Sequence, residues 1–464
     1  MTPAAPARFP ASAPAAPAWA RPGAAASVRA TAEKVAPAAL GLPFLIVLAY
    51  IFVEYGRPQD WIGVIAKLRP GLLTLGAGML ALVGTRSFSI PKPGLYMIGF
   101  LCVMAAGIPF AVNNGQAYLA TKDYAIFIFG AVFPIMMFVD SYRKAMIFFR
   151  VWVAIHISLA IFGIKNNGVG VGAFLTDEND FALVINMVLP YAVFLLPTTT
   201  SWKGKILLLG ATAIFFFAVV ASFSRGGFLG LVAAGVFIWL KSPRKAASLA
   251  GIVVLAGVMS FFVPQKYWNE MKTIETADNE NDTGHKRLYY WGLGWRMYLD
   301  HFLIGAGPKG FQFESFKYES DTEIAKGHHV WGKASHSLYF TLLPEEGTLG
   351  VIMFMGVMLT STNMRRKISK DFTELQKTRP EAVTQSLRTI FLLSRAADVS
   401  LVGFLVTGAF ITVLYYPHFW LLAAFSVALS RAYEEQRRLV PEAAAPQPAP
   451  APRWGAAVPK PRLA

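Results

Sequence analysis

The sequence predicts an all-α polytopic membrane protein. Of its 464 residues, 55% are hydrophobic and only 15% are charged. Apolar runs of about 16 to 24 residues recur along most of the chain, close to the roughly 20 residues that a spanning helix needs. The repeated ten-residue alternating segments of a membrane β-barrel are absent from the sequence.

The Lys and Arg residues are distributed unequally between the two sides of the predicted membrane spans. The net charge is +16, and 27 of the 43 Lys and Arg residues fall on one side if every apolar run crosses the membrane once. This asymmetry is the positive-inside pattern and not a footprint for nucleic acid. An even number of spans then places both termini in the cytoplasm.

We predict about twelve spans between two disordered tails, residues 1–37 and 435–464. Nine spans fall within 38–263 and three within 337–434, with an outer loop domain over 264–336 between them. Lys67, Arg69 and Pro70 interrupt the second span. The predicted spans are 38–54, 62–84, 94–112, 122–139, 145–164, 181–197, 204–222, 227–240, 247–263, 337–360, 398–415 and 418–434.

The outer loop domain contains an amphipathic helix. Its aromatic and apolar residues recur in steps of three and four, which is the spacing of one helix face. We expect this face to pack against the bundle or the lipid interface, where Trp and Tyr are enriched; the alternative is a wall over a site that opens to the membrane. The face consists of Leu288, Trp291, Trp295, Tyr298 and Phe302.

Arg225 is a charged residue between two apolar runs. A charge inside a membrane protein faces water, protein or an anion and marks a functional site more often than not. The neighbouring Gly226 and Gly227 allow close approach by a ligand. The alternative is a helix-end charge paired with Asp177 or Asp180.

Two further residues are expected on the same outer side. Arg287 begins the amphipathic helix, and His336 directly precedes a span. Guanidinium groups match phosphate oxygens, and an imidazole titrates near neutral pH, so these residues together suit an anionic diphosphate and a proton transfer. Arg57, in a short outer loop, forms either a clasp with Asp60 or a contact with the same ligand.

Several motifs together resemble the O-antigen ligase/polymerase family. They are the Ser-Arg-Gly-Gly turn at 224–227, the run 301–307, the His-Ser-Leu-Tyr motif at 336–339 and the run 345–350, and the segment 52–61 resembles the exosortase-associated O-glycosylation ligases. The resemblance implies a bacterial inner-membrane glycosyltransferase of GT-C-like architecture. Its active site would face the periplasm.

The resemblance also implies roles for individual residues. His336 would activate the acceptor hydroxyl. Arg225 and Arg287 would hold the donor diphosphate. Glu345 matches the family's Glu and would orient either the backbone or the acceptor. The residues that we predict in substrate binding are Arg225, Arg287, Arg57, Tyr339 and Glu345.

Other candidates have weaker support. The chain has Ser337 where the family often has Asn, and Phe302 where it often has Pro, which weakens a catalytic role for His301. Asp177, Glu178 and Asp180 are read as a solvated loop and not as a metal cluster. Among the remaining histidines, the sequence places His328 and His329 in an exposed loop and His156 in the core.

The leading interpretation is an O-antigen ligase that transfers glycan from undecaprenyl pyrophosphate to lipid A-core oligosaccharide, in contact with membrane lipids and without metal, cofactor or nucleic acid. An O-antigen polymerase or a protein O-oligosaccharyltransferase would use the same donor and stays open. A transporter or flippase predicts charges deep inside several spans and repeat symmetry between halves. The sequence shows neither feature.

Overall fold

The computed structural model describes residues 39–85, 89–172, 174–262, 265–272, 283–321, 324 and 329–441. The chain divides into two units, Met1–Gly41 and Leu42–Ala464, and the second contains every described helix. Within the described residues there are helices and no strand, as the fold class predicts. The tail 1–37 and residues 442–464 of the second predicted tail lie outside the described residues. The first residues of that tail, 435–438, instead belong to the last helix.

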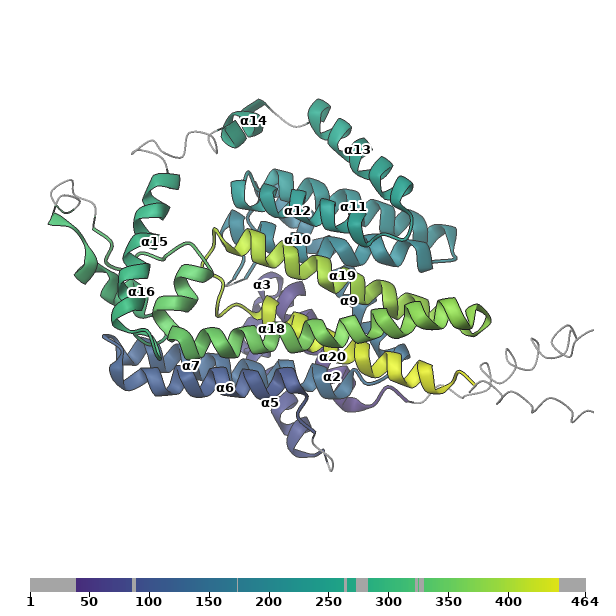
Figure 1. The fold of residues 1–464 in the computed structure, drawn as a ribbon, viewed down its shortest axis with the longest axis horizontal. Coiled ribbons are helices and arrows are strands. Elements are labelled where there is room, and N and C mark those ends of the chain that lie inside the picture. The colour runs from purple at the N-terminus through teal and green to yellow at the C-terminus, as the bar shows by residue number, and fades with distance from the viewer. Residues whose placement is uncertain are drawn as a thin grey trace, which may run out of the picture. The chain divides into compact units, whose positions relative to one another are not determined.

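The described part of the chain is made of helices that follow one another along the sequence (Figure 1). Those before the predicted outer loop domain are α2 (Leu42–Gly56), α3 (Pro58–Trp61), α4 (Gly63–Lys67), α5 (Pro70–Val83), α6 (Lys92–Gly107), α7 (Asn114–Phe127), the π-helix η3 (Ile128–Val132), α8 (Phe133–Phe138), α9 (Tyr142–Lys165), α10 (Glu178–Leu195), α11 (Trp202–Ala221), α12 (Arg225–Lys241) and α13 (Lys245–Phe262). Those after it begins are α14 (Gln265–Lys272), α15 (Thr283–Asp300), α16 (Gly310–Glu314), α18 (Tyr339–Thr378), α19 (Gln385–Gly408) and α20 (Pro417–Arg438).

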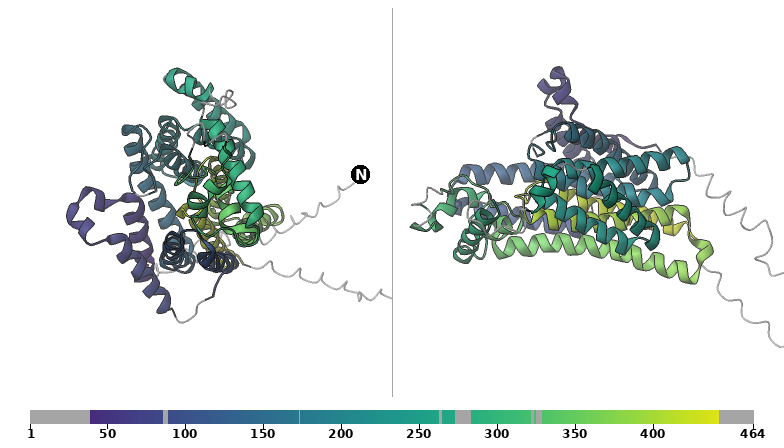
Figure 2. Two further views of the ribbon diagram at one scale, coloured as in Figure 1. Left: turned by 90° about the vertical axis from the view of Figure 1, so that its left-hand side faces the viewer. Right: turned by 90° about the horizontal axis from the view of Figure 1, so that it is seen from above.

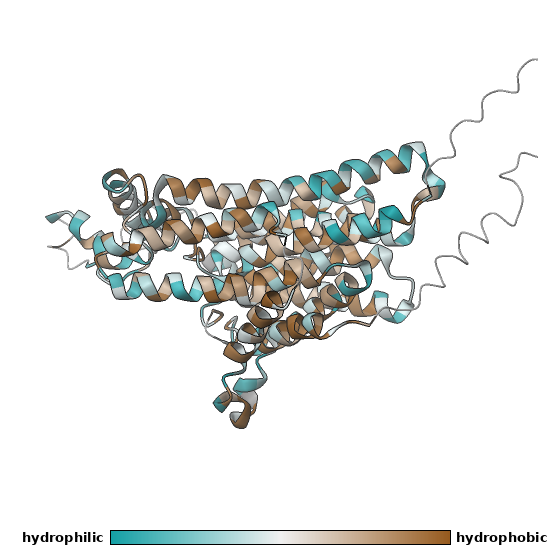
Figure 3. Ribbon diagram, turned by 90° about the horizontal axis from the view of Figure 1, so that it is seen from below, coloured by the Kyte–Doolittle hydropathy of each residue, from teal (hydrophilic) through white to brown (hydrophobic). Residues whose placement is uncertain are grey.

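Seven helical segments in the described part of the chain are long and apolar enough to cross a membrane. This supports the prediction of a multi-pass membrane protein, whereas the count of twelve spans stays a prediction. Figure 3 shows apolar residues along the middle of the bundle and hydrophilic residues towards its ends. The seven are Lys92–Phe110, Asn114–Phe138, Tyr142–Lys165, Glu178–Thr198, Trp202–Ala221, Tyr339–Thr378 and Gln385–Gly408, with shorter apolar helices at Leu42–Gly56, Pro70–Val83 and Lys245–Val258.

Several predicted spans differ from the helices observed; for example, α18 continues to Thr378, beyond the predicted end at residue 360. The segment 62–84 is divided, because Arg69 adopts a left-handed backbone (φ 48°) directly before Pro70 begins α5, and a proline disfavours helical backbone at the residue before it. The predicted span 398–415 is wrong at both ends. Its helix, α19, begins at Gln385 and ends at Gly408.

Helix α10 lies in the core and packs against α11, α12 and α19. Asn186 on α10 donates to the carbonyl of Gly227 on α12 at 2.8 Å, and also contacts Thr407 on α19. A Cβ on Gly230 would collide with Thr407, so only glycine allows α12 and α19 to approach this closely. Figure 2 gives two further views of the helix bundle.

The amphipathic helix forms as predicted, as α15. Its buried residues include Leu293 and Met297, and Met297 packs with Ala306 and Phe311. The predicted face turns mostly outward instead, with Leu288, Trp295 and Phe302 about half exposed. This exposure favours contact with the lipid interface over packing inside the bundle.

Candidate functional site

The candidate site is built around residues 409–416, which connect α19 to α20. At this end of the bundle, the starts of α12 and α18 lie near α15 (Figure 1). Three side chains of the connection bind other segments. Thr412 Oγ1 accepts a hydrogen bond from the backbone of His336 at 3.0 Å, and the Tyr416 hydroxyl donates to Asp180 at 3.2 Å. The third, Tyr415, binds α18.

His336 is exposed and held by its backbone. Its φ of 48° lies in the left-handed region, which costs a non-glycine residue roughly 1–2 kcal/mol. The hydrogen bond to Thr412 and the buried Ser335, whose hydroxyl lies 2.7 Å from that of Thr341, support this conformation. The side chain is therefore presented to solvent by a turn that its neighbours fix.

The electrostatic surroundings of His336 favour a neutral imidazole. Nearby protein atoms partly remove the ring from water and lower its pKa. The positive charges of Arg287 and Lys333 lower the pKa further, and Asp177 acts in the opposite direction. His336 is accordingly neutral near pH 7 and able to accept a proton.

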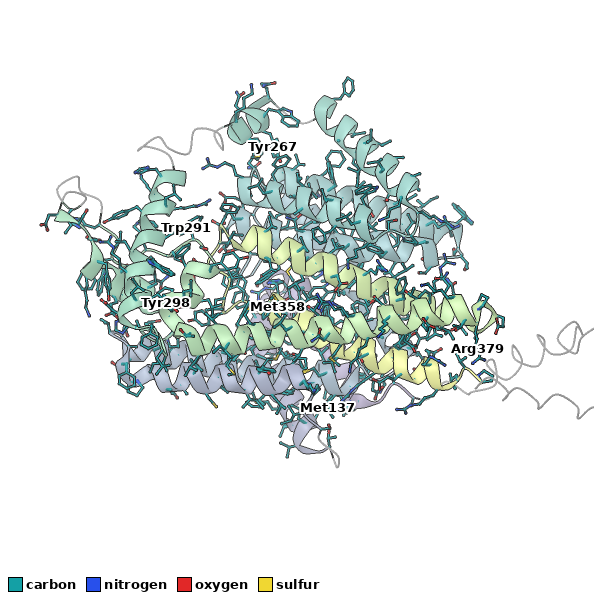
Figure 4. All side chains as sticks on the ribbon, viewed as in Figure 1. Met137, Tyr267, Trp291, Tyr298, Met358 and Arg379 are labelled. Carbon is teal, nitrogen blue, oxygen red and sulfur yellow. The ribbon has the colours of Figure 1, made fainter. Side chains whose placement is uncertain are left out.

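Arg287 reaches the site from α15. Trp291, one turn later on the same face, donates from its indole to the carbonyl of Ser335 at 3.1 Å. Its ring stacks on Phe340 at 5.3 Å with an angle of 9° and lies 6.4 Å from Phe410. Figure 4 shows Trp291 between α15 and the bundle. This anchor brings Arg287 close enough to affect the pKa of His336.

Arg225 reaches the site as the first residue of α12. Ser224 caps the helix by accepting from the backbone of Gly227 at 2.9 Å, and its hydroxyl donates to Asn179 at 2.6 Å. The N-terminus of a helix favours anions, since its first N–H groups and the helix dipole are positive. Both the guanidinium and the backbone of this turn therefore suit a phosphate.

The two glycines after Arg225 serve packing. A Cβ on Gly226 would lie 3.1 Å from Phe410, and one on Gly227 would lie 2.5 Å from Ala182. From the sequence, we expect a ligand to lie close to these glycines. Instead, α10 and the 409–416 connection pack against them. Phe410 thus lies between the Arg225 turn and Trp291.

One backbone interface joins two runs that lie far apart in the sequence, 301–307 and 345–350. Gly347 has a φ of 61° where α18 kinks, and a Cβ there would collide with the backbone of Gly305. Backbone hydrogen bonds join Ala306 to Pro344 at 2.8 Å and Thr348 to Phe302 at 2.7 Å. Glycine is required at the kink because side chains tolerate neither this φ nor this contact.

Glu345 is buried in this interface. Its carboxylate accepts from the backbone of Lys309 at 3.0 Å, the backbone of Phe311 at 3.3 Å and the hydroxyl of Tyr415 at 2.6 Å. With 1% of its surface exposed, it orients the surrounding backbone. Direct contact with a substrate is not favoured by this position.

Arg57 and Tyr339 lie at the edge of the site. Arg57 forms the expected clasp with Asp60, with nitrogen–oxygen distances of 2.9 and 3.1 Å. It also borders Gly172, where a Cβ would lie 3.0 Å from its Nε. The Tyr339 side chain is 40% exposed, and its hydroxyl donates to the carbonyl of Leu405 at 2.9 Å.

The remaining candidates have structural partners. Asp177 caps α10 by accepting from Asn179 at 2.8 Å. His301 lies 3.1 Å from Glu314, which also binds Lys317. No group of three His, Cys, Asp or Glu side chains is placed to hold a metal ion in the described ranges. As expected, His156 is buried and bonded to a carbonyl and His329 is exposed, while His328 lies outside the described residues.

Sequence reasoning missed the 409–416 connection and its partners. Phe410, Ile411, Val413 and Leu414 extend the apolar run of α19, so hydropathy alone predicts a continuing span. The consecutive tyrosines before Pro417 were the one available signal, because such a cluster often ends a membrane helix. The other residues missed were Asn179, Glu346, Thr412, Tyr415 and Tyr416.

Comparison with known proteins identifies a similar segment in a known family. Residues 210–355, which include Arg225, Arg287 and His336, match the family model described as O-antigen ligase. This segment is similar to the O-antigen ligase family. The chain is also 22% identical over 327 residues to the teichuronic acid biosynthesis protein TuaE of Bacillus subtilis (strain 168). The similarity covers 61% of this chain and 66% of that protein, just under two thirds of its length.

This match supports an enzyme of the glycosyl-transfer kind. The O-antigen ligase resemblance predicted from the motifs is thereby confirmed. The 409–416 connection lies outside the matched segment. Its residues nevertheless contact residues that the family model covers.

Proposed function

We propose that this protein is a glycosyltransferase that moves a glycan from undecaprenyl pyrophosphate to lipid A-core oligosaccharide. The observation that carries this proposal is the gathering of Arg225, Arg287 and His336 from three distant segments around residues 409–416. Two arginines on segments that contact this connection, together with an exposed neutral imidazole, match a diphosphate leaving group and a hydroxyl nucleophile.

The reaction we propose is one direct displacement. His336 accepts the proton of the acceptor hydroxyl as the hydroxyl oxygen attacks the anomeric carbon of the donor sugar. The bond between this carbon and the diphosphate oxygen breaks, and the lipid diphosphate leaves with the electron pair. Arg225, Arg287 and the start of α12 stabilise the developing negative charge, a role in which no metal ion is needed.

The proposed site faces the periplasm. The Lys and Arg residues that set the predicted topology include those of the second half of α18 and the end of α20. Figure 1 shows these helix ends away from α15 and α16. The positive-inside rule then places the charged ends in the cytoplasm and the 409–416 connection on the opposite side.

A polymerase that uses the same donor is the second candidate. The similarity to a protein of teichuronic acid biosynthesis favours it, since that name refers to a different polymer. In this alternative the acceptor would be the end of a growing glycan. The roles of the three site residues would not change, because the donor diphosphate and the acceptor hydroxyl remain.

Deletion of the gene, followed by gel analysis of lipopolysaccharide, distinguishes these functions. Loss of all polymer from lipid A-core is the result we expect. Retention of a single repeat unit would instead identify a polymerase. Unchanged lipopolysaccharide together with altered glycoproteins would identify a protein O-oligosaccharyltransferase and contradict the proposal.

A further inference from the structure

Tyr415 lies between two buried carboxyl groups. Its hydroxyl oxygen is 2.6 Å from Glu345 Oε2 and 2.7 Å from Glu346 Oε1. The two glutamates are 1% and 0% exposed. Oxygen–oxygen distances this short each require a proton between the atoms.

The phenol supplies only one of these two protons. The second therefore resides on one of the glutamates. Glu345 accepts two backbone N–H groups, from Lys309 and Phe311, and these stabilise its ionised form. Among the described residues, Glu346 Oε2 is buried without a hydrogen-bond partner.

We propose that Glu346 carries the second proton and that the three groups form a directed chain. The carboxyl of Glu346 donates to the Tyr415 oxygen, and the Tyr415 hydroxyl donates to the carboxylate of Glu345. Only one buried negative charge then remains, and it is the one that backbone donors surround.

This hydrogen-bond chain positions His336, the proposed base. At one end of the hydrogen-bond chain, Glu345 accepts from the backbone of residues 309–311. At the other, Tyr415 lies three residues after Thr412, which accepts a hydrogen bond from the backbone of His336. Lys309 Nζ also lies 5.2 Å from the centre of the Tyr415 ring. Tyr415 and Glu346 are thus positioning residues that act through the connection on His336. This role rests on the proposed function, whereas the protonation of Glu346 does not.

Glutamine substitutions test the direction of the chain. Glu346→Gln keeps an uncharged donor toward Tyr415, so its melting temperature should stay within a few degrees of that of the natural protein. Glu345→Gln places an amide N–H₂ against groups that donate, and it should lower the melting temperature clearly. Infrared difference spectra of the natural protein minus Glu346→Gln should show the carbonyl band of a protonated carboxyl group. Absence of this band, or equal destabilisation by both variants, would overturn the assignment.

Tyr415→Phe tests the positioning role. The rate constant for transfer should fall by about tenfold with an unchanged KM for the donor, since a buried hydrogen-bond chain is lost while the arginines remain. Tyr433→Phe is the matched control, because its hydroxyl donates to Asp371 at 2.7 Å outside the 409–416 connection. An unchanged rate constant for Tyr415→Phe would refute positioning. Inactive natural protein would refute the proposed function instead, and the infrared result would still stand.

Discussion

Replacement of Thr412 by valine should slow glycan transfer without weakening donor binding. Valine has nearly the shape of threonine but cannot accept the hydrogen bond from the backbone of His336. A neutral hydrogen bond contributes about 0.5–1.5 kcal/mol, which corresponds to a roughly 2- to 13-fold change in a rate. His336 needs this support because its φ of 48° is unfavourable for a residue with a side chain.

Initial rates with lipid-linked donor and acceptor in detergent would measure this effect. Thr412→Ser keeps the hydroxyl and should remain close to the natural rate. Thr360→Val is a matched control, since the Thr360 hydroxyl donates to Gly356 within α18, outside the site. The reasoning fails if Thr412→Val transfers at the natural rate, or if Thr412→Ser is as slow as Thr412→Val.

Three other outcomes are expected. Arg225→Lys should reduce transfer roughly 10- to 150-fold, because the bidentate contact with phosphate is lost; a near-natural rate would exclude a donor clamp. Lys333→Ala should raise the pKa of His336 and move the acidic fall of the pH–rate profile to higher pH, because a positive charge that disfavours protonation is removed; an unmoved profile would contradict His336 as the base. In a cysteine-free background, a cysteine at Ser320 should react with an impermeant reagent in spheroplasts and one at Ser369 should not; reversed labelling would place the site in the cytoplasm.

The sequence predicts the helices well where one local signal dominates. Helix α12 begins at Arg225 because Ser224 is a good N-cap and the glycines that follow permit tight packing. Helix α15 follows from its aromatic spacing, although spacing alone does not say which face is buried. Leu293 and Met297 are buried, and Met297 packs against Ala306 and Phe311, which the period of the helix does not reveal.

The supports of the site could not be predicted from the sequence. Thr412, Tyr415 and Tyr416 belong to an apolar run whose hydropathy resembles that of a span, and their partners lie 69 to 236 residues away in the chain. Only the tertiary fold brings such pairs together. By contrast, Arg225 and His336 are visible in the sequence because charged and titratable side chains are rare beside apolar runs.

Transfer by His336→Gln is the measurement that tests the central claim most directly. Glutamine can form hydrogen bonds but cannot accept a proton as a base near neutral pH. With purified protein, lipid-linked glycan, acceptor and excess EDTA, the natural enzyme should be active and His336→Gln should be inactive while still binding donor. Substantial transfer by His336→Gln would contradict the account, and so would natural activity that requires an added divalent metal.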